Sequence, residues 1–83
     1  MLNVSYTEDA LRDLRRIGRV AAVRVMEKVA AYAAKPSAFT NRVKRLKGSG
    51  YLRLRVGDYR VVFSEDGVVM WVIHIGHRRE VYR

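Results

Sequence analysis

The chain has 83 residues, enough for one domain with a single small core, and that domain is expected to span residues 1–83. Its 17 Lys and Arg against eight Asp and Glu give a formal net charge of +9 and a pI near 10.7. The absence of cysteine excludes a disulfide framework, a thiolate zinc site and a cysteine nucleophile, and no apolar run approaches the roughly 18 residues of a membrane span.

The first residues predict a short strand and then a helix. Leu2, Val4 and Tyr6 alternate with polar residues, as in a half-buried strand. Thr7 is a suitable N-cap, and the carboxylates that follow it complement the positive end of a helix dipole. The helix is expected to end at Gly18 and to carry its apolar residues at helical spacing, namely Leu11, Leu14 and Ile17.

A second helix is predicted over residues 19–34, where Pro36 and the residue before it stop the pattern. Together the two helices predict a helical hairpin with an apolar stripe that needs a partner surface. The residues of the second helix expected in the core are Val20, Val23, Met26 or Val25, Val29 and Ala33.

Residues 38–50 are largely polar and basic, with four cations around Val43 and Leu46, and end in Gly48-Ser49-Gly50. This composition predicts a loop that carries positive charge. It belongs to a strongly basic second part of the chain, since residues 35–83 hold eleven basic and four acidic residues, whereas residues 1–34 hold six and four. Such a surplus favours nucleic acid as a partner.

Three strands are predicted in the remaining sequence. Residues 51–56 and 59–64 form a hairpin across Gly57-Asp58, and Asp66-Gly67 indicates a turn before a third strand. That third strand, residues 68–75, is almost continuously apolar, which is typical of a strand inside the sheet. The predicted fold is α+β, in the order β-α-α-β-β-β, with the helical hairpin on one face of a small, mostly antiparallel sheet.

The opposite face of the sheet is expected to be open and cationic. Successive strand residues point to opposite faces, so Leu52, Leu54 and Val56 enter the core while Arg53 and Arg55 line the other side. The same alternation puts Tyr51 of this strand, and Arg60 and Val62 of the next, on the open face. The residues that follow the last strand can fold back over its end, namely Arg78, Arg79 and Tyr82.

Four segments, in this order and spacing, resemble the RelE branch of the RelE/ParE toxin superfamily: Leu46-Lys47-Gly48, Leu52-Arg53-Leu54-Arg55, Gly57-Asp58-Tyr59-Arg60 and Gly76-His77-Arg78-Arg79-Glu80-Val81-Tyr82. The resemblance covers essentially the whole chain and implies a RelE-like microbial RNase-type fold. It also implies a toxin of a type II toxin–antitoxin system that enters the ribosomal A site, cuts mRNA and so inhibits translation.

The resemblance implies catalytic roles for Arg53, Arg60, Arg78 and Tyr82. Arg60 matches the arginine that binds the scissile phosphate, and Tyr82 matches a tyrosine that stacks on the substrate base or helps to move a proton. Arg53 takes the second of two basic positions on its strand, while the first falls on Tyr51, a departure from the family pattern.

The general base stays open between Tyr82 and His77, because arginine does not deprotonate in proteins. His74 is interpreted as a core or rim histidine, and Trp71 as sheet packing with base stacking as the alternative. The expected RNA contacts are Lys44, Arg45, Lys47, Tyr51, Arg55, Arg79 and Arg83, with contact to the antitoxin as the alternative for the last two.

The expected partners are an acidic, RelB-like antitoxin, the ribosome and mRNA, in the cytoplasm and without a membrane. No metal or small-molecule cofactor is expected, because two histidines three residues apart with no carboxylate cluster make a poor metal site. Two alternatives remain: inhibition of DNA gyrase, as in the ParE branch that shares this fold, and a non-catalytic RNA-binding member of the superfamily.

Overall fold

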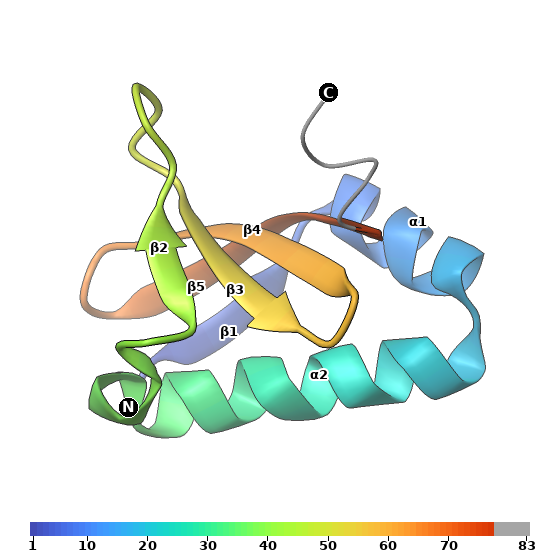
Figure 1. Ribbon diagram of the computed structural model, residues 1–83, viewed down its shortest axis with the longest axis horizontal. Coiled ribbons are helices and arrows are strands. Elements are labelled where there is room, and N and C mark those ends of the chain that lie inside the picture. The colour runs from blue at the N-terminus through green and yellow to red at the C-terminus, as the bar shows by residue number, and fades with distance from the viewer. Residues whose placement is uncertain (78–83) are drawn as a thin grey trace.

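The computed structural model describes residues 1–77, in which two helices pack on one face of a five-stranded sheet (Figure 1). The strands lie in the order β1-β5-β4-β3-β2; β1 pairs with β5 in parallel and the other pairs are antiparallel. This confirms the predicted α+β class. The elements are β1 (Asn3–Tyr6), α1 (Glu8–Ile17), α2 (Arg19–Ala34), the 3₁₀ helix η1 (Pro36–Phe39), β2 (Val43–Arg45), β3 (Leu52–Val56), β4 (Tyr59–Glu65) and β5 (Val69–His77).

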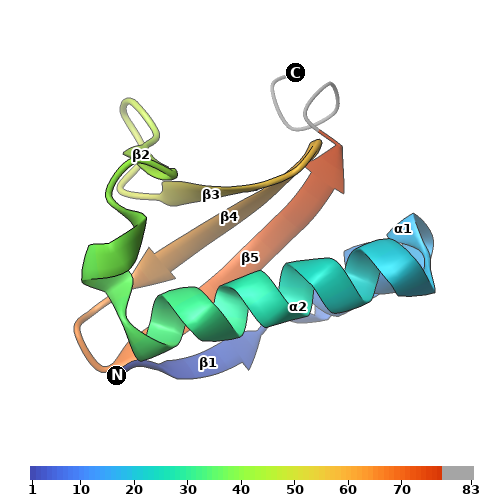
Figure 2. The ribbon, with the colours of Figure 1, turned by 60° about the horizontal axis from the view of Figure 1, so that its bottom comes forward.

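The core lies between the sheet and the helices, with α2 running along the sheet (Figure 2). Leu54, Phe63 and Ile75 are fully buried on the sheet side, and Val25 and Val29 are buried on α2. Strand alternation explains this set, because these sheet residues share one face of the pleat. Within residues 1–77 no helix is long and apolar enough to cross a membrane.

The buried stripe of α2 differs from the predicted one. The predicted Val25, Val29 and Ala33 are buried, whereas Val20, Val23 and Met26 are 75%, 48% and 46% exposed. Tyr32, which the prediction left out, is 4% exposed. The Tyr32 ring packs edge-to-face on Phe63 with centroids 5.1 Å apart, and its hydroxyl donates to Glu65 Oε2 at 2.8 Å. Both stripes have helical spacing, so the helix sequence does not select between them. The buried stripe is the one that packs the large Tyr32 ring against the sheet.

The buried and exposed positions of α1 also differ from the prediction. Leu11 is 42% exposed, whereas Ala10 and Asp13 on the neighbouring stripe are buried with Leu14. The reason is that α1 packs against β5 through a polar contact of Asp13, which turns Leu11 away from the core.

Residues 43–45 form an edge strand, so the prediction of a loop over residues 38–50 is wrong at this point. Lys44 lies opposite Arg53 and Val43 opposite Leu54 of β3. A three-residue strand with a single apolar side chain has too little alternation to be recognised from sequence. Short, charged edge strands are also the kind that proteins use to prevent further pairing.

Helix α1 covers the part of β5 that β1 leaves unpaired. β1 ends at Tyr6, opposite Val72, and the Thr7 hydroxyl then donates to the Ile73 carbonyl at 3.0 Å. Further along, the Ile75 amide donates to Asp13 Oδ2 at 2.9 Å. Side chains of α1 therefore take the place of a neighbouring strand along this edge.

Thr7 has two roles, and its replacement by valine is expected to lower the free energy of unfolding by about 1–2 kcal/mol. Its Oγ1 accepts from the Ala10 amide at 3.1 Å as the predicted N-cap, besides donating to Ile73. Thermal unfolding should show a Tm lower by roughly 4–8 °C per kcal/mol. Thr7→Ser keeps the hydroxyl, so its Tm should be close to that of the wild type. A Thr7→Val variant with the wild-type Tm would refute both roles.

Candidate nucleic-acid interface

The face of the sheet away from the helices carries aligned cationic side chains. Arg53 lies opposite Val62, and Arg55 lies opposite Arg60. Partners in antiparallel strands point to the same face, and Leu54 and Val56 between them are buried in the core. We call this surface the arginine face; its members on β2 to β5 are Lys44, Arg53, Arg55, Arg60, Val62 and His74.

The electrostatics of the arginine face favour an anion. Arg55 and Arg60 are directly opposed, and like charges in this position destabilise a strand pair. Burial lowers the pKa of Arg53, and the positive charge of Arg55 lowers it further. A phosphate placed among these groups would accept charge-assisted hydrogen bonds from them, bidentate where the geometry allows.

The other predicted RNA contacts surround this face unevenly. Tyr51, next to the start of β3, is 43% exposed. Lys47 is exposed in the turn between β2 and β3. Arg45 lies opposite Leu52, on the helix side of the edge strand, and is also exposed. The remaining predicted site residues lie outside the described part of the chain; they are Arg78, Arg79, Tyr82 and Arg83.

His77 lies on the helix side of the sheet. It is the partner of Tyr59, whose ring packs against the core, and the two rings meet edge-to-face with centroids 5.9 Å apart. Together with Arg16 and Ile17 of α1, they line a cavity of about 280 Å³. The structure therefore separates His77 from the arginine face by the thickness of the sheet.

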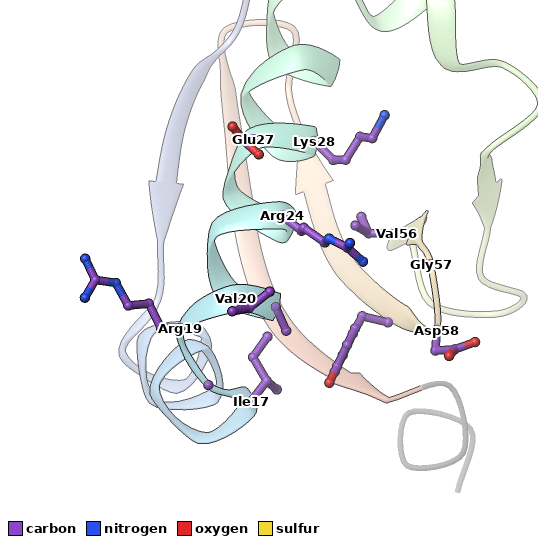
Figure 3. A pocket seen from close by; sticks show the side chains of 12 residues that line it. Ile17, Arg19, Val20, Arg24, Glu27, Lys28, Val56, Gly57 and Asp58 are labelled. Carbon is purple, nitrogen blue, oxygen red and sulfur yellow. The ribbon is translucent and has the colours of Figure 1, made fainter.

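A cleft of about 780 Å³ also lies on the helix side, between the first half of α2 and the β3–β4 turn. In Figure 3, Arg24 extends from α2 toward Val56, while Arg19 points away. Glu27 and Asp58 add negative charge to its lining. Because its charges are mixed and neither Arg53 nor Arg60 lines it, the cleft suits a polyanion less well than the arginine face does.

Three residues near the arginine face were not assigned to function from the sequence. His74 is half-exposed and bound to the buried Asp13, and Trp71 is 44% exposed, with Ser64 opposite it on β4. Only the exposure of Trp71 had a signal in the sequence, as an aromatic residue alternating with the buried Met70 and Val72. Among residues 1–77, no three His, Asp or Glu side chains gather where they could hold a metal ion.

Comparison with known proteins gives a family match over nearly all of the chain. The model of the ParE toxin of the type II toxin–antitoxin system parDE matches residues 4–82. No curated protein sequence shows a significant match.

Several solved structures share the fold at low sequence identity. A chain of the archaeal RelE–RelB complex from Pyrococcus horikoshii OT3 superposes with a TM-score of 0.76 at 22% identity, covering 95% of this chain and 97% of that one. A chain of the intact E. coli RelBE complex superposes with a TM-score of 0.72 at 24% identity, covering 93% of this chain and 96% of that one. E. coli YafQ gives 0.70 at 12% identity, with both chains covered completely.

Proposed function

We propose that this chain, which belongs to the ParE toxin family of type II toxin–antitoxin systems, cuts mRNA in the ribosomal A site. The observation that carries the proposal is the Arg55–Arg60 pair, with Arg53 on the same face. Directly opposed guanidinium groups are costly in a strand pair and suit a bound phosphate. Binding to the ribosome makes the cytoplasm the place of action.

The proposed reaction is attack of the RNA 2′-hydroxyl on the adjacent phosphate. Guanidinium groups of Arg53 and Arg60 neutralise the negative charge that develops on the phosphorane oxygens, an effect of about 3 kcal/mol per donor by analogy with oxyanion sites. Arg78 and Tyr82, outside the described residues, are proposed to complete the site. The ribosome contributes by holding the mRNA in line, and the scheme uses no metal ion or small-molecule cofactor.

Affinity for the ribosome is proposed to come from cations around the site. Contacts to ribosomal RNA phosphates position a protein without reading sequence. The residues proposed for this role are Lys44, Arg45, Lys47, Tyr51, Arg55, Arg79 and Arg83.

The proposed inhibitor is an acidic, RelB-like antitoxin. RelB and DinJ are the partners in complexes whose toxin chains share this fold. A net charge of +9, concentrated in residues 35–83, attracts an acidic segment that orders on binding over the arginine face. Bound there, the segment would exclude mRNA.

Inhibition of DNA gyrase is the second candidate function. The matching family model is that of ParE, and the ParE branch of the superfamily poisons gyrase. A gyrase inhibitor needs no side chain that takes part in phosphate chemistry, so the arginine face would then serve only to bind its partner.

Primer extension on a reporter mRNA in a reconstituted translation reaction, with and without ribosomes, tests the proposal. Cuts within codons that require ribosomes are expected. The parallel assay is gyrase supercoiling with the same protein preparation. Intact mRNA with loss of supercoiling would replace the ribonuclease by the gyrase inhibitor, and absence of both effects would leave a non-catalytic RNA-binding protein.

A further inference from the structure

The side chains of Asp13 on α1 and His74 on β5 are joined by a hydrogen bond. His74 Nδ1 lies 2.6 Å from Asp13 Oδ2, and the Asp13 side chain is only 12% exposed. The same carboxylate accepts from the Ile75 amide at 2.9 Å, and its other oxygen accepts from Arg16 at 3.1 Å. These contacts hold the carboxylate in one place, so it orients the imidazole. A carboxylate only accepts hydrogen bonds, which places the ring proton on Nδ1 and leaves Nε2 as the proton acceptor of a neutral His74.

An irregularity in β5 places His74 on the arginine face. Val62 and Phe63 are neighbours on β4, yet they lie opposite His74 and Val72, so Ile73 is an extra residue in the strand. Without it, strict alternation from the buried Val72 would turn His74 into the core. Bulges of this kind re-aim side chains and are common beside active sites.

The bulge brings His74 within reach of the arginines. Lys44, Arg53, Val62 and His74 form one row across β2 to β5. Arg60 lies opposite Gly76, two residues from His74, which makes Arg60 and His74 diagonal neighbours at about 7–8 Å. Gly76 has no side chain, so His74 is the nearest β5 side chain to Arg60 on this face. A phosphate bound by Arg60 would therefore have an imidazole beside it.

We propose that His74 is the general base of RNA cleavage and that Asp13 is its positioning residue; this rests on the ribonuclease function proposed above. Nε2 of His74 takes the proton of the 2′-hydroxyl as the 2′-oxygen bonds to phosphorus. The bond from phosphorus to the 5′-oxygen breaks, and that oxygen leaves with the electron pair and takes a proton from water. The products are a 2′,3′-cyclic phosphate and a 5′-hydroxyl, and His74 returns its proton to solvent.

The structure favours His74 over the other described histidine for this role. His77 faces the helices beside Arg16 and Tyr59, away from the arginine face. His74 has a side chain 42% exposed, on the face where Arg53 and Arg60 meet. Position and orientation select a general base before its acidity does.

The test is single-turnover cleavage of mRNA on programmed ribosomes with saturating toxin. His74→Gln is expected to slow cleavage by about 10²–10⁴-fold and Asp13→Asn by about 10–100-fold. A histidine base must be neutral to act, so the wild-type rate should fall at acid pH and this fall should disappear in His74→Gln. The charged groups around His74, by contact or by strand register, are Asp13 and its partner Arg16 on α1, Arg60 on β4 and, beyond Val62, Arg53 on β3; these enter the profile.

Added imidazole should restore part of the activity of His74→Ala, which a purely structural role of His74 would not allow. Circular dichroism and melting of each variant separate loss of the base from loss of the fold. The inference would be overturned if folded His74→Gln cleaved within about threefold of the wild-type rate. It would also be overturned if the fall in rate at acid pH disappeared in His77→Gln and persisted in His74→Gln. In both cases the proposed ribonuclease function would still stand if the wild-type protein cut mRNA on ribosomes and Arg60→Ala did not. A wild-type protein that never cuts mRNA would refute both the ribonuclease function and the role of His74.

Discussion

Replacing Arg60 with alanine is expected to slow ribosome-dependent mRNA cleavage by about 10²–10³-fold, the usual effect of removing one donor to a developing oxyanion. Arg60 lies on β4 directly opposite Arg55, and its strand neighbours Tyr59 and Val61 face the core. The strand therefore holds the guanidinium in position without any loop. The rate is measured in single-turnover reactions at saturating toxin, so that weaker ribosome binding does not contribute.

Arg12→Ala is the matched control, since it removes the same charge from a side chain 68% exposed on α1 and bonded to Asp9. It should cleave like the wild type. Arg60→Lys keeps the charge but loses the bidentate geometry, and it should recover only part of the rate. If Arg60→Ala and Arg12→Ala cut equally fast, the arginine face does not contain the active site.

Replacing Phe63 with alanine is expected to lower the free energy of unfolding by about 3–5 kcal/mol. Phe63 is fully buried on β4, and its ring packs edge-to-face on Tyr32 of α2. The substitution removes apolar burial, leaves a cavity and takes away the aromatic contact between helix and sheet. An 83-residue domain has only a modest total stability, so a large part of the population should unfold near physiological temperature.

Denaturant unfolding followed by circular dichroism measures this loss. Val68→Ala is the control, because Val68 is 62% exposed and its truncation should change stability by less than about 0.5 kcal/mol. A Phe63→Ala protein that unfolds at the wild-type denaturant concentration would contradict the description of the core.

Much of the arginine face could be predicted from local pattern. Leu52, Leu54 and Val56 alternate with Arg53 and Arg55, and the structure buries the first set in or against the core and places the arginines on the other side. The two-residue turn at Gly57-Asp58 then sets the register that brings Arg60 opposite Arg55. Each of these steps depends on residues close in sequence.

The histidines show where local pattern was insufficient. Strict alternation from the buried Val72 would put His74 in the core, yet the bulge at Ile73 puts it on the arginine face, while His77 faces the helices. The bulge is defined by pairing with β4, and a strand read alone gives no sign of it. The partner of His74, Asp13, comes from a helix near the other end of the chain.

Local residue patterns were sufficient to predict the strong positive charge, the N-cap at Thr7, the hairpin at Gly57 and the alternation that separates core from arginine face. Only packing between distant segments fixed which stripe of α2 is buried, the pairing of residues 43–45 with the sheet, and the contact of Asp13 with His74. The difference lies in the range of the interactions. Caps, turns and strand alternation are set by residues a few positions apart, whereas helix rotation, edge pairing and side-chain bonds between distant elements exist only once the surfaces are in contact.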